Sequence, residues 1–422
     1  MQRLNFKTLL FLLAALLGGE ANAESACTAT YATRNDWATG FVVDVVLTNS
    51  GATPVRGWKV SWSYDSPVKL TNPPWGATVR ISGGSVVVTD NGWNPSIAPG
   101  GKISFGMALT YSGRVKPQPS DITVSGEGCL SAAATPISFY TDPDSNAAVW
   151  VRNNPSDYRA TAIREQVAAN PAGKWFGGWS GNISTAVDQY VGAAAALKKM
   201  PILVAYNIPG RDCGQYSAGG ANAADEYQSW ISAFAAAIGV RKAVVILEPD
   251  ALPQLDCLND EARAERLQLF RYAVEQFSSK APNALLYLDA GNSTWLPASV
   301  IASRLIAAGV ATVRGFSLNV SNYQTTGDNA AYGNAVNAEL MRQRGFSKSF
   351  VIDTSRNGNG PYGSQWCDPP GRKLGATSRQ HTDGSQPEMT LWIKMPGEAD
   401  GCLAPAGSFV PDAAYKLIYG YY

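Results

Sequence analysis

The sequence predicts a multidomain protein, an all-β sandwich followed by an α/β barrel, and three observations support this. The chain has 422 residues, which is long enough for more than one hydrophobic core. Residues 24–130 contain short β-branched runs between Gly, Pro, Asn and Asp turns, without a helical period. From residue 137, apolar runs alternate with Ala-rich amphipathic segments, which is typical of a parallel sheet buried on both faces.

The first 23 residues have the pattern of a secretory signal peptide. Arg3 and Lys7 supply the basic start, Leu9 to Leu17 the apolar core, and Ala21-Asn22-Ala23 the small-residue cleavage site. The apolar run is too short for a membrane anchor, so we expect no membrane association. The mature protein is expected to begin near Glu24 and to be secreted into the extracellular medium.

The charge balance and the histidine content narrow the function classes. The 34 basic and 33 acidic side chains nearly cancel, whereas a protein that binds nucleic acid needs a basic surplus. His381 is the single histidine, which excludes a multi-histidine metal site and makes a histidine-based catalytic triad improbable. We expect a monomer with no cofactor, no metal and no nucleic-acid partner.

Six cysteines in an exported chain predict three disulfides, for which fifteen pairings exist. Cys27 and Cys129 lie at the two ends of the β-rich segment, so a disulfide between them would join the ends of one domain. Two shorter loops then remain, and they pair Cys213 with Cys257 and Cys367 with Cys402. No CxxC spacing occurs, so a zinc or redox site is not indicated.

Residues 131–136 form a short linker, and residues 137–422 carry the alternating pattern of the barrel. The expected strands are the apolar runs at 201–206, 243–247, 285–288, 350–352 and 391–393, with helices such as 225–238 and 260–278 between them. About 285 residues with this rhythm fit an α/β barrel.

Polar residues follow each apolar run, at the point where the strand ends. The carboxylates among them are Asp212, Glu248, Asp250, Asp289, Asp353, Glu398 and Asp400. Strand ends of a parallel barrel open onto one face, so these side chains are expected to converge on one cleft. A role in capping a helix or a turn explains any one of these carboxylates, but it does not explain why each of five strands is followed by one.

Three tryptophans, Trp150, Trp295 and Trp366, lie in similar loops and offer surfaces on which sugar rings stack. Several carboxylates, aromatic platforms, export and the lack of a metal motif together indicate glycoside hydrolysis. This reaction needs one carboxylic acid held protonated and a second carboxylate that assists water. Crowding of like charges raises one pKa and so keeps that acid protonated near neutral pH.

At these residues the chain resembles glycoside hydrolase family 6, the inverting β-1,4-glucanases, from about Ile137 to the C-terminus. The motifs that carry the resemblance are Tyr206 with Arg211-Asp212-Cys213, Leu247-Glu248-Pro249-Asp250, Leu288-Asp289-Ala290-Gly291, Asn319-Val320-Ser321-Asn322-Tyr323, Trp366-Cys367-Asp368, and Lys394 with Gly397-Glu398-Ala399-Asp400-Gly401. The resemblance implies a distorted parallel β/α barrel.

The resemblance also implies roles for individual residues. Asp250 would be the general acid. Asp212 would keep Asp250 protonated, support the positive transition state and relay a proton from water. Asp400 would be the base, its pKa lowered by Arg356 and Lys394, and Tyr206 would favour distortion of the reacting sugar. The implied sugar-binding positions are Trp150, Trp295 and Trp366 for stacking, and Asp289, Asn322, Lys394 and Glu398 for hydroxyl groups.

Two departures from the family pattern are visible. A serine near the reacting water is frequent in the family, and here either Ser217 or, with a shift of one residue, Ala218 occupies that place. Asn292, which is also expected at a sugar-binding position, replaces a histidine that often follows Asp-Ala-Gly, and this replacement is expected to remove one sugar contact.

Residues Cys27 to Cys129 resemble a family 2 cellulose-binding module. Trp37, Trp75 and Trp93 match the exposed tryptophans of such modules, and Trp75 and Trp93 lie among Pro, Gly and Asn. Trp58 and Trp62 alternate with polar residues in a strand and are expected in the core. A planar row of rings suits stacking on cellulose.

The sequence therefore predicts an endo-β-1,4-glucanase that acts on cellulose and soluble β-1,4-glucans. Two alternatives are a cellobiohydrolase of the same family and an inactive carbohydrate-binding protein, and chitin or xylan stays open as a substrate. Long loops roof the cleft of a cellobiohydrolase, whereas here about 27 residues separate Trp366 from Lys394, which favours an open cleft. The intact Asp212, Asp250 and Asp400 argue against an inactive barrel.

Overall fold

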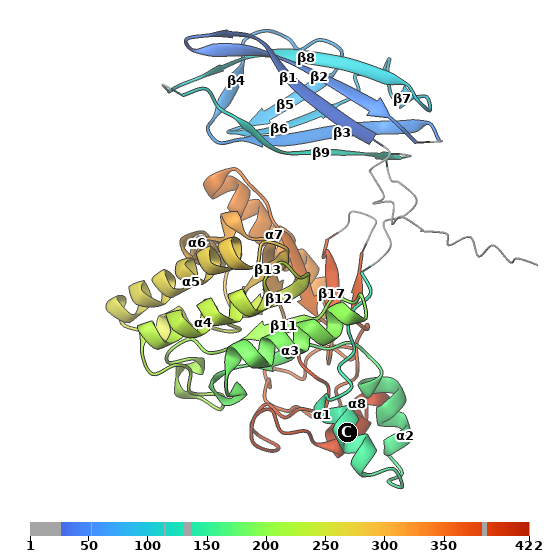
Figure 1. Ribbon diagram of the computed structural model, residues 1–422, viewed down its shortest axis with the longest axis vertical. Coiled ribbons are helices and arrows are strands. Elements are labelled where there is room, and N and C mark those ends of the chain that lie inside the picture. Colours follow the sequence, from blue (N-terminus) through green and yellow to red (C-terminus); the bar gives the residue numbers. More distant parts are fainter. Residues whose placement is uncertain are drawn as a thin grey trace, which may run out of the picture. The chain divides into compact units, whose positions relative to one another are not determined.

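The computed structural model describes residues 27–51, 53–113, 115–127, 129, 137–381 and 386–421. The predicted signal peptide and linker lie outside the described residues. The chain divides into two compact units, before and after residue 135, which are considered separately below (Figure 1).

The N-terminal unit is a sandwich of two antiparallel sheets, as predicted. One sheet has the strand order β1-β2-β8-β4, and the other has the order β5-β6-β3-β7 with β9 paired to β3. The strands are β1 (Cys27–Trp37), β2 (Gly40–Asn49), β3 (Val55–Tyr64), β4 (Val68–Leu70), β5 (Thr78–Ser82), β6 (Ser85–Thr89), β7 (Ser96–Ile97), β8 (Lys102–Tyr111) and β9 (Pro119–Glu127).

The sandwich core consists of alternate residues of its strands, because successive side chains of a strand point to opposite faces. In β2, Phe41, Val43 and Val45 are buried, while the residues between them are partly exposed. Trp58 and Trp62 are buried, which confirms their predicted place in the core. The Trp58 ring stacks on Phe105 with centroids 5.5 Å apart.

The second unit is built on an eight-stranded sheet in the order β10-β11-β12-β13-β14-β15-β17-β16, parallel from β10 to β17. Its strands are β10 (Lys174–Phe176), β11 (Ile202–Ala205), β12 (Ala243–Leu247), β13 (Ala284–Asp289), β14 (Gly315–Leu318), β15 (Ser349–Asp353), β16 (Arg379–Gln380) and β17 (Met389–Leu391). Short β10 and β14 do not stand out in the sequence.

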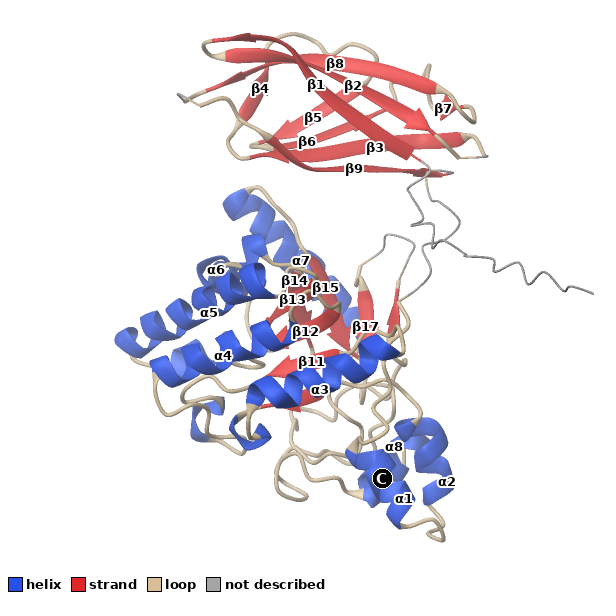
Figure 2. Ribbon diagram, in the orientation of Figure 1, coloured by secondary structure: helices blue, strands red, loops and turns tan. Residues whose placement is uncertain are grey.

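Helices follow most of the parallel strands and pack side by side on the outside of the sheet (Figure 2). They are α3 (Ile183–Ala196), α4 (Ala224–Ile238), α5 (Asp260–Lys280), α6 (Ala298–Ala308) and α7 (Thr326–Arg344). The helices α1 (Asn146–Asn153), α2 (Ala160–Ile163) and α8 (Pro411–Tyr419) pack together as a separate group (Figure 2). None of the helices in the described ranges is long and apolar enough to cross a membrane.

The strands read as continuous apolar runs because both faces of the sheet are covered. In β11, Ile202 and Val204 join the core inside the barrel, and Leu203 and Ala205 join the core between sheet and helices. The curled sheet brings the start of β10 close to the end of β17, where the Gly173 N–H donates to the Trp392 carbonyl oxygen at 2.7 Å. The strands therefore form a distorted barrel, with their carboxyl ends and following loops at one end.

All three predicted disulfides are confirmed. Their Cα–Cα distances are 4.9 Å for Cys27–Cys129, 6.2 Å for Cys213–Cys257 and 5.8 Å for Cys367–Cys402. The first joins the two ends of the sandwich, and the other two tie loops that follow barrel strands.

Candidate active site

The loops at the carboxyl ends of the barrel strands enclose a cleft of about 1380 Å³. Most of the predicted site residues line it, although they come from distant parts of the chain. These residues are Tyr206, Asp212, Asp250, Asn292, Trp295, Asn322, Trp366, Lys394, Glu398 and Asp400. Asp289 and Trp150 are not among the lining residues.

Asp250 lies in the turn that follows β12. Its backbone has a φ of 70°, in the left-handed region that costs energy for a residue other than glycine and is enriched at active sites. Burial raises the pKa of the Asp250 carboxyl well above its ordinary value, and the nearby charges of Asp289, Asp212 and Asp400 raise it further. Asp250 is therefore suited to hold a proton where other carboxylates are ionised.

Asp212 follows β11 and is held as a hydrogen-bond acceptor. Its Oδ2 accepts from the Ser217 backbone N–H at 2.7 Å, and its Oδ1 accepts from the Gln254 side-chain amide at 3.1 Å. Both partners donate, so each oxygen of the Asp212 carboxyl group is held in place by one hydrogen bond. The Cys213–Cys257 disulfide joins this loop to the loop of Gln254. Both Ser217 and Ala218 line the cleft.

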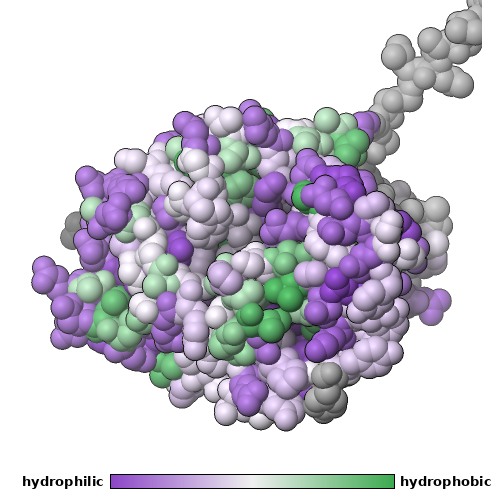
Figure 3. All heavy atoms as spheres, turned by 90° about the horizontal axis from the view of Figure 1, so that it is seen from below, coloured by the Kyte–Doolittle hydropathy of each residue, from purple (hydrophilic) through white to green (hydrophobic). Residues whose placement is uncertain are grey.

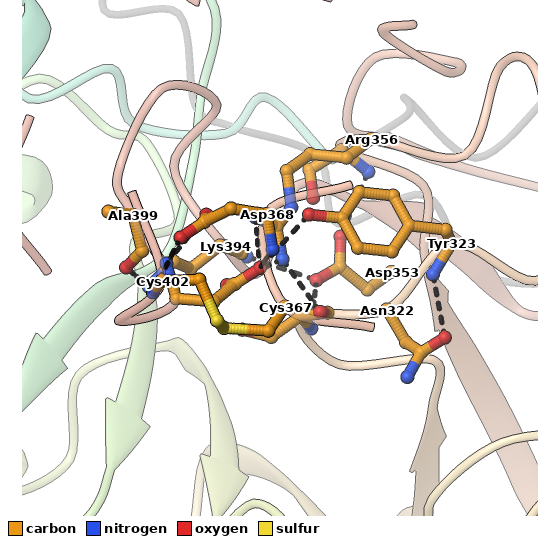
Figure 4. A network of polar contacts seen from close by, with 12 residues as sticks. Asn322, Tyr323, Asp353, Arg356, Cys367, Asp368, Lys394, Ala399 and Cys402 are labelled. Atoms are coloured by element: carbon orange, nitrogen blue, oxygen red, sulfur yellow. Dashed lines mark hydrogen bonds and ion pairs between the residues drawn. A yellow bond between two sulfur atoms is a disulfide. The ribbon is translucent and has the colours of Figure 1, made fainter. Parts of the chain in front are cut away.

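Asp400 is a buried carboxylate inside a dense polar network. Figure 4 shows this network, with Tyr323, Arg356 and Asp368 among its labelled residues. Arg356 donates to both of its oxygens, at 2.9 and 3.0 Å, and the Tyr323 hydroxyl donates to Oδ2 at 3.0 Å. Burial alone disfavours the charged form, but the charges of Arg356 and Lys394 outweigh it and hold the pKa of Asp400 below its ordinary value. Asp400 and Asp250 therefore have opposite pKa shifts in one cleft.

Asp368 links the loop of Asp400 to the loop that follows β15. Its carboxylate accepts the backbone N–H groups of Asp400, Cys402 and Leu403 at 2.8, 3.1 and 2.9 Å. The sequence does not predict this role of Asp368, because its partners are backbone groups more than thirty residues away.

Three of the strand-end carboxylates bind the protein's own backbone and lie outside the cleft lining. Glu248 accepts from the Asn207 and Ile208 N–H groups, and Asp289 accepts from the Asp250 and Gly291 N–H groups. Asp353 accepts from four backbone N–H groups, those of residues 321, 355, 393 and 394. The expectation that all strand-end acids face one cleft is wrong for these three, since each one fixes the loop of a neighbouring strand instead.

Asp289 is thus placed behind Asp250 and does not reach the cleft as a sugar-binding group. Its Oδ2 accepts the Asp250 N–H at 3.0 Å, and 1% of the residue is exposed. Burial raises the pKa of Asp289 to about 7, although hydrogen bonds from Asp250, Gly291 and Ser317 oppose the shift.

Trp150, which was expected to stack on a sugar ring, is not among the residues that line the cleft. It lies in α1 and packs against a small hydrophobic cluster, with its ring 6.2 Å from that of Phe409 and the Arg159 guanidinium 5.4 Å from its centroid. Neither of these two neighbours lines the cleft, so the Trp150 ring is not placed to stack on a sugar there.

The other predicted sugar-binding residues do reach the cleft. Trp295 and Trp366 keep 38% and 43% of their surfaces exposed, which suits stacking. Glu398 accepts from the Asn146 amide at 2.7 Å, and the Lys394 ammonium lies 5.5 Å from the Trp175 ring centroid. The Asn292 Oδ1 accepts hydrogen bonds from the backbone N–H and the hydroxyl of Thr294.

Tyr206 lies at the end of β11 between Trp175 and Arg211. Its ring meets Trp175 edge to face at 5.1 Å, and the Arg211 guanidinium lies 4.8 Å from its centroid. Burial and the charges of Asp250 and Asp212 raise the pKa of its hydroxyl, so Tyr206 stays neutral and can donate a hydrogen bond.

Several lining residues had no predicted role, among them Trp175, Trp179, Tyr216 and Gln254. Tyr216 approaches Trp366 from the loop after β11, with ring centroids 5.8 Å apart. An aromatic residue among loop residues was the available sequence signal, but Trp150 gives the same signal in the sequence and is not among the residues that line the cleft.

The three module tryptophans predicted at the surface are exposed by 42% (Trp37), 43% (Trp75) and 73% (Trp93). Glycines make room for two of the rings. A Cβ at Gly40 would lie 2.5 Å from the Trp37 ring, and one at Gly106 would lie 2.2 Å from the Trp75 ring. Gly40 and Gly106 belong to neighbouring strands β2 and β8, so both rings rest on the same sheet.

The surface of the molecule is a mosaic of polar and apolar side chains on the face drawn in Figure 3, where hydrophobic atoms gather in small separate patches. Within the described ranges, no group of three or more His, Cys, Asp or Glu side chains is arranged to hold a metal ion.

Comparison with known proteins assigns families to both units. The glycosyl hydrolases family 6 profile matches residues 135–409, and the cellulose binding domain profile matches residues 27–129. Endoglucanase 1 of Streptomyces halstedii is 52% identical over 289 residues, which cover 67% of this chain and 89% of that protein. Endoglucanase A of Cellulomonas fimi is 37% identical over 423 residues, covering 92% of this chain and 90% of that protein.

Solved structures agree with this assignment. The endoglucanase Cel6 from Mycobacterium tuberculosis superposes with a TM-score of 0.63 at 42% identity, covering 68% of this chain and 98% of that one. Fungal relatives are more distant, and cellobiohydrolase C of Emericella nidulans is 33% identical over 47% of this chain. On the profile match, these relatives and the cleft geometry, the chain belongs to the glycosyl hydrolases of family 6.

Proposed function

We propose that this protein is a secreted, inverting endo-β-1,4-glucanase that hydrolyses cellulose and soluble β-1,4-glucans. The observation that carries the proposal is the opposite shift of two pKa values in one cleft, raised for Asp250 and lowered for Asp400. Glycoside hydrolysis with inversion needs such a pair, one acid that gives a proton and one carboxylate that stays ionised.

In this proposal Asp250 donates its proton to the glycosidic oxygen as the bond to the anomeric carbon breaks. A water molecule attacks the anomeric carbon from the opposite face, which inverts its configuration. The Asp212 carboxylate stabilises the positive charge that develops on the sugar and favours the protonated form of Asp250, whose pKa its charge raises.

The hydrogen bonds of Asp400 define where it can meet the reacting water. Its Oδ2 accepts from Arg356, Tyr323 and Asp368, whereas in the described part of the chain Oδ1 accepts from Arg356 alone. Each oxygen of a carboxylate offers about two acceptor positions, so Oδ1 keeps one position that its bond from Arg356 does not use. We assign Oδ1 as the acceptor of the water's proton, with relay through Asp212.

The endo mode of action is supported by the higher identity of this chain to endoglucanases than to cellobiohydrolases. Relatives named endoglucanase are 37–52% identical to this chain, while the cellobiohydrolases are 31–33% identical over 47% of it. The cellulose-binding domain would hold the enzyme on the solid substrate. The N-terminal signal pattern supports secretion.

Two measurements on carboxymethyl cellulose and cello-oligosaccharides test the proposal. An endoglucanase lowers viscosity early relative to the release of reducing ends, whereas a cellobiohydrolase does not, and an inactive binding protein releases none. Proton NMR of the first product should show the α-anomer. An initial β-anomer would contradict the inverting mechanism, and parallel assays on chitin and xylan would show whether β-1,4-glucan is preferred.

A further inference from the structure

Trp179 is an exposed tryptophan on the wall of the cleft that neither the predicted roles nor the proposed mechanism uses. It lies in a short turn, Gly178–Ser180, directly after β10. The ring keeps 58% of its surface exposed and is among the residues that line the cleft. Burial of such a ring against a ligand is favourable, because a large apolar area leaves water.

The protein holds this ring in a fixed position. A Cβ at Gly177 would lie 2.3 Å from the Trp179 ring, so the absence of a side chain there lets the ring rest on the backbone. The turn is closed by the Ser180 hydroxyl, which accepts the Gly177 N–H at 3.1 Å. A ring that is already ordered loses little conformational entropy when a ligand stacks on it.

Arg211 connects Trp179 to the reaction centre. Its guanidinium lies 5.0 Å from the Trp179 ring centroid and 4.8 Å from that of Tyr206. Hydrogen bonds to the carbonyl oxygens of Ser217 at 2.7 Å and Tyr206 at 3.0 Å fix the guanidinium. Trp179 is therefore separated from Tyr206 by a single side chain, on the same wall of the cleft.

We propose that Trp179 is a stacking platform for a glucosyl residue of the bound glucan, on the Tyr206 side of the bond that is cleaved. This inference rests on the proposed function and adds a binding position to it. The C–H face of a β-linked glucosyl unit is apolar and flat, so it matches the exposed indole, while its hydroxyl groups point sideways into water and polar neighbours.

A purely structural role for Trp179 makes a different prediction. If the ring served only to hold Arg211 and the Asp212 loop, its removal would slow the chemical step equally for substrates of every length. A stacking platform instead affects those chains that are long enough to reach it, and it acts mainly through KM.

The test compares Trp179→Ala, Trp179→Phe and wild type on cellotriose through cellohexaose. For Trp179→Ala we expect kcat/KM to fall about tenfold on cellohexaose, corresponding to about 1.4 kcal/mol, and progressively less on shorter chains. Trp179→Phe should recover most of the loss because it restores an aromatic face. Tyr158→Ala is the matched control, since Tyr158 is 74% exposed and is not among the cleft-lining residues.

A loss that is the same for all chain lengths and lies in kcat would overturn the platform, as would unchanged kcat/KM on every oligosaccharide. Calorimetric titration of cellohexaose into Asp250→Asn, with and without Trp179→Ala, measures the same contact without hydrolysis and should show about tenfold weaker binding for the double variant. Failure of the wild-type enzyme to cleave any glucan would refute the proposed function, whereas equal cellohexaose affinity in that titration would refute the role of Trp179.

Discussion

Asp368 and Asp400 each accept a hydrogen bond from the backbone N–H of the other. The Asp400 N–H donates to Asp368 Oδ1 at 2.8 Å, and the Asp368 N–H donates to Asp400 Oδ2 at 3.1 Å. The Cys367–Cys402 disulfide joins the loops beside this pair. The loop after β15 and the loop after β17 are thus locked together at the carboxylate that we propose accepts the water's proton.

Asp368→Ala should lower kcat on soluble glucan by roughly 10- to 100-fold, because a small displacement of a reacting group has effects of that order. The Asp400, Cys402 and Leu403 N–H groups would lose their acceptor. Asp368→Asn keeps one acceptor oxygen and should lose less. Steady-state kinetics, with thermal unfolding as the control for folding, check this. Wild-type kcat in the alanine variant would show that the reciprocal bonds do not position Asp400.

Asp250→Asn should reduce hydrolysis of unactivated glucan by ~10²–10⁴-fold, the usual effect of losing a general acid. The fold and cellulose binding should be unchanged. Aryl cellobiosides with a good leaving group need little protonation, so the variant should retain much more activity on them. Comparison of the two substrate classes checks the assignment, which near-normal turnover of cellulose would refute.

Asp289→Asn should move the alkaline limb of the pH profile to lower pH. Asp250 must be protonated to act, so activity falls as pH rises through its pKa. After burial, the charge of Asp289 is the largest cause that raises the pKa of Asp250. Asparagine removes this charge and keeps an oxygen for the Asp250 N–H. The pH dependence of kcat/KM measures the shift, and an unmoved or higher alkaline limb would contradict it.

Glu248→Gln should make the stability of the barrel less dependent on pH. Burial raises the pKa of Glu248 from 4.5 to about 7, so the folded state binds this proton more tightly than the unfolded chain does. Stability from this group is present below pH 4.5 and is lost as pH rises toward 7, by on the order of 3 kcal/mol.

The melting temperature of the glutamine variant should therefore fall less than that of wild type between pH 4.5 and 7. Glu261→Gln, on the exposed side of α5, is the control and should follow the wild-type curve. If the melting temperatures of wild type and Glu248→Gln change with pH in parallel, Glu248 does not bind the proton that makes the stability depend on pH.

Replacement of Trp37, Trp75 and Trp93 together by alanine should abolish adsorption of the module to crystalline cellulose without unfolding it, because all three rings are exposed. Adsorption of the wild-type module should persist in high salt, since stacking is not screened as ion pairs are. Buried Trp58→Ala is the contrasting variant and should cost about 3–5 kcal/mol of stability. Wild-type adsorption by the triple variant would show that these three tryptophans do not form the cellulose-binding surface.

Removal of the module, residues 24–130, should leave activity on soluble glucan nearly unchanged and weaken activity on crystalline cellulose. The barrel has its own cores and its own cleft, so it does not need the module for hydrolysis. Assays of full-length and truncated protein on both substrates check this, and an equal loss on soluble glucan would contradict it.

The sequence by itself determined the two architectures and the place of the chemistry. Alternating burial in β2 and doubly buried runs such as β11 follow directly from the periodicity of apolar residues. Polar residues that follow parallel strands must gather at one end of the barrel. The sequence alone therefore predicts that Asp212, Asp250 and Asp400 share one cleft, and all three line it in the structure.

The tertiary structure alone decided which of these side chains face the cleft. Asp250 reaches it while Glu248, two residues earlier, turns to the Asn207 and Ile208 N–H groups, and both have positive φ angles that no periodicity predicts. Likewise, the packing of α1 turns Trp150 away, and the space above Gly177 brings Trp179 in. The direction of a side chain in a loop depends on backbone turns and on partners from distant strands, so it is fixed only when those strands have come together.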